Sequence, residues 1–226
     1  MKNDIKKSAF MIAIIVLFCI FMAVIDGVFK ANYFIKSIIK LVLFLVIPWI
    51  YSVYDKDIRI KELFLPKKSG IKPALVLGVS VYVVILGGYL LLKDVFDFSK
   101  ITGTLTKNIG VSKQNFIFVS LYISFVNSLL EEFFFRGFAF LNLKRIISRK
   151  FAYFFSASVF AVYHIAMMIG WFGIGVFLIV MAGLFAGGLI FDYLNEKSET
   201  IYTSWLVHMF ANFSINTIGF MLFGII

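Results

Sequence analysis

The chain has 226 residues, of which 62% are hydrophobic and only 15% are charged, and its mean hydropathy is +0.98. These values lie far outside those of soluble domains and exclude an ordinary water-soluble enzyme or binding module. The formal net charge of +10 does not call for nucleic acid as a partner, because basic loops of membrane proteins bind anionic lipid headgroups.

Uncharged runs predict where the chain crosses the bilayer. A membrane-spanning helix needs roughly 20 apolar residues, or somewhat fewer with help from its flanks. The first run lacks a small-residue cleavage site, so we expect a retained span rather than a signal peptide. The second run is short, and we expect it to include the preceding turn, with Lys36 and Lys40 extending to the membrane surface. The first four runs are 8–25, 41–54, 73–92 and 114–130.

Residues 151–191 carry no formal charge. One helix of this length would measure roughly 60 Å, about twice the membrane thickness, so the run must fold back on itself. The glycines and tryptophan of 168–175 mark the reversal, and residues 200–226 supply a last span. The sequence therefore predicts an all-α, polytopic membrane bundle of about seven helices that forms one domain over residues 1–226.

Basic residues indicate the orientation of this bundle. With a cytoplasmic N-terminus, fourteen Lys and Arg residues lie in inner segments and six in outer ones, which the positive-inside rule favours. We expect the polar stretches 55–72 and 93–113 to be loops. A composition rich in Phe, Ile and Lys is typical of AT-rich bacterial coding, so the expected location is a bacterial plasma membrane.

Charged residues inside a predicted span are the most informative feature. The stretch "LLEEFFFRGF" holds Glu131, Glu132 and Arg136, and each charge in a span costs about 2.5–3.5 kcal/mol on insertion scales. Glu132 and Arg136 are spaced i, i+4 as an ion pair, which by itself fits a purely structural role. This pairing leaves Glu131 without a partner, on a polar stripe that continues through Ser124 and is predicted to point into the bundle.

Both histidines of the chain, His164 and His208, also lie inside predicted spans. His208 belongs to a four-residue polar ladder with Ser204, Asn212 and Asn216. A lone intramembrane histidine commonly makes only a hydrogen bond between helices. Asp26 and Asp192 stand at span ends, where we expect solvent contact, and Gly183 with Gly187 forms a small-xxx-small pattern that predicts close helix packing.

The distances of three of these side chains from the predicted cytoplasmic helix ends place them in the same part of the membrane. Glu131 and His164 are each roughly 20 Å from a predicted cytoplasmic helix end, and His208 is about 12 Å from one. We therefore expect the three to meet in one layer that the cytosol reaches. A carboxylate accepts a proton from water, neutral imidazoles hold a water or a metal, and an amide stabilises an oxyanion. These groups together are typical of a hydrolytic site.

Three short motifs carry a family resemblance. "EEFFFR" (131–136), "FAVYH" (160–164) and "HMFAN" (208–212) resemble the EExxxR, FxxxH and HxxxN motifs of the CPBP family of intramembrane proteases. This family includes the type II CAAX prenyl endopeptidases and the Abi or bacteriocin-immunity proteins. Each motif alone is short, but the ordered set, on three spans and with both histidines, is specific. It defines a predicted catalytic core at residues 114–216.

The resemblance implies a helical bundle whose site opens to the cytosol and an endopeptidase that activates water without a covalent intermediate. Glu131 matches the general base, and His164 matches the residue that helps to hold the attacking water. His208 and Asn212 match the pair that stabilises the oxyanion. Peptides or membrane-associated proteins are the substrates that this implies.

Glu132 and Arg136 match supporting positions in the same motifs. A metal is disputed for the family, and the residues leave both possibilities open. Glu131, His164 and His208 suit zinc, and they equally suit a metal-free water site. We expect no further span after the one that carries His208, and this departure from the pattern of the eukaryotic endopeptidases disfavours prenylated CAAX substrates.

Two classes of function agree with the sequence. The first is an intramembrane endopeptidase that cleaves near the cytoplasmic face and serves peptide or bacteriocin maturation or self-immunity. The second is a non-catalytic immunity or regulatory protein whose polar layer only binds. Replacing Glu131 with Gln separates them, because it removes the base and keeps the shape. A transporter is disfavoured because the seven spans show no repeated half.

Overall fold

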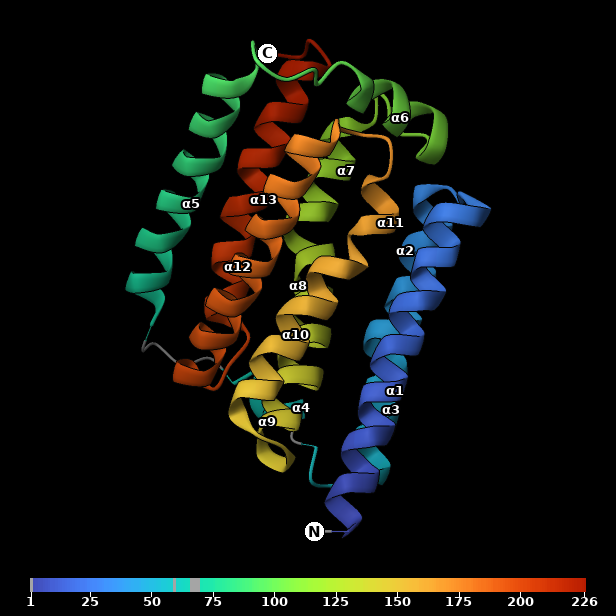
Figure 1. Cartoon of the computed structure of the whole chain (residues 1–226), viewed down its shortest axis with the longest axis vertical. Helices are drawn as coiled ribbons and strands as arrows, with labels where there is room; N and C mark the ends of the chain where they lie inside the picture. The colour runs from blue at the N-terminus through green and yellow to red at the C-terminus, as the bar shows by residue number, and fades with distance from the viewer. Residues whose placement is uncertain (1, 59, 66–69) are drawn as a thin grey trace.

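The computed structural model describes residues 2–58, 60–65 and 70–226 (Figure 1). In these ranges the regular secondary structure is helical, without strands, and seven helical segments are long and apolar enough to cross a membrane. The predicted all-α polytopic bundle is therefore confirmed. Arg59, Lys67 and Lys68, three of the basic residues predicted to face the cytoplasm, lie outside the described residues.

Several spans are composite, with α-helical and π-helical (η) segments in one continuous rod. The spans are Asp4–Phe29, Tyr33–Tyr54, Ile71–Leu92, Phe116–Ile146, Arg149–Met168, Ile174–Ser198 and Tyr202–Leu222. The elements are α1 (Lys2–Val24), η1 (Ile25–Phe29), α2 (Tyr33–Leu41), η2 (Val42–Val46), α3 (Ile47–Tyr54), α4 (Ile60–Leu63), α5 (Ile71–Leu92), α6 (Lys100–Ile109), α7 (Phe116–Tyr122), η3 (Ile123–Asn127), α8 (Ser128–Glu131), η4 (Glu132–Leu141), α9 (Asn142–Ile146), α10 (Arg149–Tyr163), α11 (Ile165–Met168), α12 (Ile174–Ser198) and α13 (Tyr202–Leu222).

The two ends of the chain lie at opposite ends of the bundle, as an odd number of spans requires (Figure 1). The assignment of the N-terminal end to the cytoplasm stays a prediction. Helix α5 packs against α13, α13 against α12, and α12 against α10. The fourth span passes through the interior, and every residue of η4 is buried. The charged motif of the sequence thus lies at the centre of the bundle.

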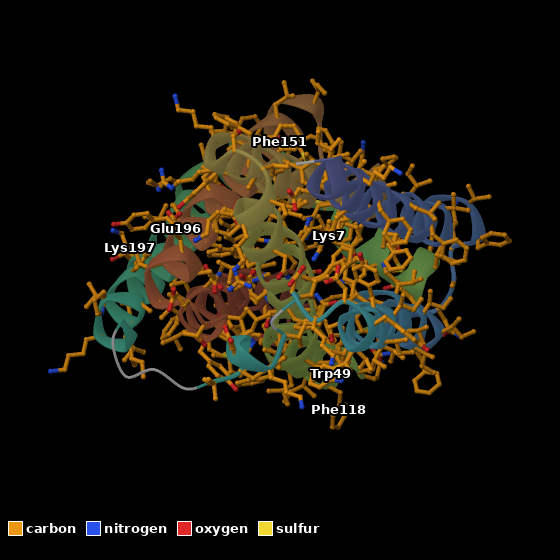
Figure 2. The ribbon with its side chains drawn as sticks, turned by 90° about the horizontal axis from the view of Figure 1, so that it is seen from below. Lys7, Trp49, Phe118, Phe151, Glu196 and Lys197 are labelled. Atoms are coloured by element: carbon orange, nitrogen blue, oxygen red, sulfur yellow. The ribbon has the colours of Figure 1, made fainter. Side chains whose placement is uncertain are left out.

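Large apolar side chains cover the outside of the bundle. Trp49, Phe118 and Phe151 lie at its rim when it is viewed from below (Figure 2), and 72% of Phe118 is exposed. A surface of this kind is stable only against hydrocarbon, because contiguous apolar patches of this extent are rare on soluble monomers. The chain is a multi-pass membrane protein surrounded by a lipid bilayer.

The second span includes the turn before residue 41, as predicted. Its helix starts after Asn32, whose side chain accepts a hydrogen bond from the backbone N–H of Ile35 at 3.0 Å, a common helix N-cap. Pro48 lies inside the span and has no N–H for the helical ladder. The π-helical turn η2 directly precedes it, so the irregular backbone coincides with the missing donor.

The prediction that Lys36 and Lys40 extend to the membrane surface is wrong. Both are buried, because each has a carboxylate partner inside the bundle. Lys36 pairs with Asp26, so the expected solvent contact of Asp26 is also wrong. At this depth an opposite charge, rather than water, stabilises each ionised side chain.

The two polar stretches predicted as loops contain short helices. Helix α4 lies within 55–72 and α6 within 93–113. Gly103, Thr102 and Thr104 give the α6 sequence little intrinsic helix preference, so the pattern did not indicate it. Helix α4 packs under η4, where the Leu63 side chain fills the space that a Cβ at Gly137 would take, 2.6 Å from its Cδ1.

Close helix packing occurs next to the predicted glycine pattern rather than at it. A Cβ built on Gly183 or Gly187 would meet no atom within 4 Å. A Cβ on Gly188 would lie 2.9 Å from the Cα of Ala157 and 3.0 Å from its Cβ. The closest approach of α10 and α12 therefore uses Gly188, one residue further along, and the predicted role of Gly183 and Gly187 in packing is wrong.

Replacing Gly188 with Val is expected to destabilise the protein by about 1–3 kcal/mol, since overpacking forces two backbones apart. The measurement is the thermal unfolding midpoint in detergent. Gly187→Val is the matched control, because that position has open space around it and should change the midpoint little. Equal loss in both variants would contradict the assigned contact.

Candidate active site

Three ionisable side chains from three spans meet at the centre of the bundle. Glu131 ends α8, His164 comes directly after α10, and His208 lies in α13. The Oε2 atom of Glu131 is 3.9 Å from Nε2 of His164 and 3.7 Å from Nε2 of His208. All three residues are buried. The predicted convergence is therefore present, at distances beyond a direct hydrogen bond but short enough for one water molecule to contact all three atoms.

The second nitrogen of each imidazole fixes its tautomer. Nδ1 of His164 lies 2.8 Å from the backbone oxygen of Phe160, and Nδ1 of His208 lies 2.9 Å from Oε1 of Glu132. Both oxygens only accept, so both Nδ1 atoms carry the proton. In a neutral ring each Nε2 then presents a lone pair toward Glu131. His208 donates from Nε2 to an oxyanion only when its ring carries a second proton.

The other oxygen of Glu131 is held by two donors. The Lys40 ammonium donates to Oε1 at 2.6 Å, and the Asn127 side-chain N–H donates to the same oxygen at 3.0 Å. Lys40 also donates to Oδ1 of Asn127 at 2.6 Å. The prediction that Glu131 lacks a partner is wrong. Because Oε1 is occupied in this way, Oε2 is the oxygen left to face the two histidines.

Glu132 links His208 to the charged pair predicted from the sequence. Its Oε1 accepts from His208, and its Oε2 lies 3.6 Å from Nε of Arg136, one turn along the helix. The predicted i, i+4 ion pair is therefore present. Glu132 and Arg136 are fully buried, so the carboxylate orients His208 while the guanidinium offsets its charge.

Asp192 is the third member of this network. Its Oδ1 lies 3.7 Å from Nε of Arg136 and accepts a hydrogen bond from Ser156 at 2.9 Å. The expected solvent contact of Asp192 is wrong, since the residue is fully buried. The guanidinium carbon of Arg136 also lies 4.0 Å from the ring centroid of Phe160, a cation–π contact. Arg136 is thus enclosed by two carboxylates and aromatic faces.

The amide of Asn212 makes a different contact from the one that its motif implies. Its N–H donates to the backbone oxygen of Ile123 at 3.2 Å. Ile123 starts the π-helical turn η3, a kind of turn that often occurs at functional sites. Asn212 is one helical turn from His208 and buried, so it lies near the site with its amide engaged by the backbone. A role on an oxyanion stays a prediction.

The polar ladder of the last span faces inward, as expected. Ser204, His208, Asn212 and Asn216 are all buried. Asn216 donates to the Ser124 hydroxyl at 2.9 Å, so the ladder of α13 packs along the polar stripe of the fourth span. Paired polar edges of this kind hold two membrane helices in one register.

The site is enclosed in this conformation. Five phenylalanines that come after Glu131 along η4 toward the lower end of the bundle are buried; they are Phe133, Phe134, Phe135, Phe138 and Phe140. A cavity of about 210 Å³ lies instead toward the other end, and Asp26, Lys36 and Ala166 help to line it. Ala166 is two residues past His164. Glu131 itself is 2% exposed, so contact with a substrate requires surrounding side chains to move.

The spacing of the side chains does not fit a zinc ion. Across the described ranges, no group of three or more His, Cys, Asp and Glu residues is placed to hold a metal. Ligand atoms around a tetrahedral zinc with bonds of about 2.0 Å lie roughly 3.3 Å apart, closer than the 3.7 and 3.9 Å found from Glu131 to His208 and His164. Lys40 also places a cation on Glu131 already. The predicted metal set of Glu131, His164 and His208 therefore lacks zinc-binding geometry in this conformation.

The arrangement nevertheless has the groups that hydrolysis by water needs. Within the described residues, the hydrogen bonds to the Glu131 carboxylate go to Oε1. Its Oε2 atom faces two imidazole nitrogens and is left to accept a hydrogen bond from water. A water between these atoms would be oriented by the imidazoles and deprotonated by the carboxylate. The enclosure keeps electrostatic interactions strong, because the local dielectric is low.

Comparisons with known proteins agree with the motifs. Residues 113–214 match the family model described as "Type II CAAX prenyl endopeptidase Rce1-like". No curated protein and no solved structure matches the chain. The matched segment contains Glu131, His164 and His208, but it does not include Lys40, which comes from the second span.

Proposed function

We propose, from the premise that residues 113–214 form a type II CAAX endopeptidase-like segment of the CPBP family, that the protein is an intramembrane endopeptidase. Its substrate is a peptide or a membrane-associated protein. The observation that carries the proposal is the convergence of Glu131 Oε2 with Nε2 of His164 and Nε2 of His208 inside the bilayer.

In the proposed reaction, Glu131 removes a proton from water as the water oxygen attacks the carbonyl carbon of the scissile peptide bond. The proton then passes to the departing nitrogen, so that the products are a carboxylic acid and an amine. His164 orients the water. His208, held by Glu132, stabilises the oxyanion when its ring is doubly protonated, and Asn212 assists if its amide leaves Ile123.

The biological setting is also part of the proposal. The protein acts in a bacterial plasma membrane on a peptide whose maturation or neutralisation requires cleavage, at a site within the membrane that is predicted to be reached from the cytoplasmic side. The basic residues of the predicted inner segments support this orientation. The three motifs lie in the segment 114–216, which contains all six candidate site residues and forms the core of the catalytic unit.

A comparison of released peptides tests this function. Cells that produce the native protein or the Glu131→Gln variant at equal membrane levels are analysed by mass spectrometry of peptides. We expect a set of peptides whose release depends on Glu131. Indistinguishable peptide sets would contradict an endopeptidase and favour the non-catalytic immunity or regulatory protein.

A further inference from the structure

Lys40 is the closest charged neighbour of Glu131, although it is remote in sequence and lies outside the matched segment. Its ammonium donates to Glu131 Oε1 and to Asn127 Oδ1, both at 2.6 Å. The ammonium also lies 5.0 Å from the ring centroid of Tyr163 and 5.6 Å from that of Phe44. The lysine therefore has a built, desolvated site with a carboxylate, an amide and two aromatic faces.

The two carboxylate oxygens of Glu131 have different neighbours. Lys40 and Asn127 both donate to Oε1, whereas Oε2 faces His164 and His208. A carboxylate with one oxygen fixed by two donors loses rotation about its terminal bond. Oε2 is then pointed at the imidazole pair before a substrate arrives, which is the kind of preorganisation that efficient catalysis uses.

We propose that Lys40 is a positioning residue of the hydrolytic site, which orients Glu131 and makes the second span part of the catalytic unit. This inference rests on the proposed endopeptidase function. It goes beyond the three motifs, since none of them includes a residue of α2.

The chain supplies a matched control one turn away. Lys36 lies on the same helix, is equally buried, and pairs with Asp26 rather than with Glu131. The double variant Asp26→Asn/Lys36→Met therefore removes a buried ion pair of the same type without changing the contacts of Glu131. Loss of a buried ammonium from α2 is common to both proteins, whereas only Lys40→Met leaves the carboxylate partner in place.

The experiment measures the initial rate of release of the Glu131-dependent peptides from isolated membranes, per amount of folded protein. Lys40→Met is expected to lower the rate by about 100-fold, because a misplacement of about 1 Å in a reacting group costs a factor of this size. The Asp26→Asn/Lys36→Met protein should stay within about threefold of the native rate, and Lys40→Arg should lie between native and Lys40→Met, because it restores the charge with a different shape.

Chemical rescue separates positioning by charge from packing. In Lys40→Ala membranes, n-propylammonium replaces the missing end of the side chain and is expected to restore at least part of the rate. The neutral 1-propanol has the same length and should not. Equal rescue by both compounds, or a Lys40→Met rate no lower than that of the control, would overturn the role of Lys40. Peptide release that is insensitive to Glu131→Gln would instead overturn the proposed function itself.

Discussion

Glu131→Gln is expected to lower the rate of peptide release by about 10²–10⁴-fold, the usual contribution of a general base. The amide keeps the size of the side chain and still offers an oxygen to Lys40, but it does not take a proton from water. The measurement is the initial rate in isolated membranes, with the amount of folded protein determined for each variant. The substitution leaves the buried Lys40 ammonium without its carboxylate partner, so the thermal unfolding midpoint is expected to fall as well, and rates are therefore compared per amount of folded protein.

Glu196→Gln serves as the matched control for this substitution. Glu196 is also a carboxylate in a membrane-spanning helix, but it accepts hydrogen bonds from Arg149 at 2.6 Å and from Tyr153 at 2.7 Å near the lower end of α12. Its loss should leave the rate within about threefold of native, since none of these contacts reaches the predicted base. A Glu131→Gln protein that keeps the native rate would remove Glu131 from the mechanism.

Arg136→Met is expected to have the largest effect on stability. Arg136 is fully buried between Glu132 and Asp192, and its removal leaves two carboxylates in a low-dielectric interior without a cation. Breaking a buried charge network by removing one partner costs about 3–5 kcal/mol. Thermal unfolding in detergent, together with the yield of folded protein, measures the loss.

The triple variant Glu132→Gln/Arg136→Met/Asp192→Asn tests the physical reason. It removes the whole charge network at once, so no uncompensated charge remains, and neutral replacement of buried ion pairs is often tolerated. We expect most of the lost stability to return. Arg149→Met, which removes an exposed arginine from Glu196, should change the midpoint little. A triple variant as unstable as Arg136→Met would show that packing around Arg136, rather than charge, sets its contribution.

The sequence predicted the spans and the meeting of Glu131, His164 and His208 for one reason. Periodicity and distance from helix ends fix both the face and the depth of a residue on a straight rod. Two membrane helices side by side share one depth scale, so residues at equal depth on inward faces must come close. The Glu132–Arg136 pair was equally accessible, because its two members lie one turn apart on one helix.

Periodicity and depth did not predict the ion pairs between residues on helices that are distant in sequence. Lys40 is 91 positions from Glu131, and a lysine near a helix end is commonly assumed to reach for the surface. Asp192 was placed by its distance from the span end, which does not reveal that Arg136 lies opposite. The available signal was an imbalance of charge. Once Arg136 is paired with Glu132, Glu131 in the core still needs a cation, and Lys40 is a basic residue at the edge of the predicted second span.

The depth of Glu131 affects the fate of the two chain ends that cleavage produces. Glu131 is the middle residue of the 31-residue span Phe116–Ile146, about 20 Å from either helix end. A peptide bond is neutral, whereas a free carboxylate and a free ammonium are costly to keep in hydrocarbon. Cutting at this depth would therefore generate a neutral carboxylic acid and a neutral amine, and their ionisation and hydration on reaching water would drive product expulsion and oppose religation.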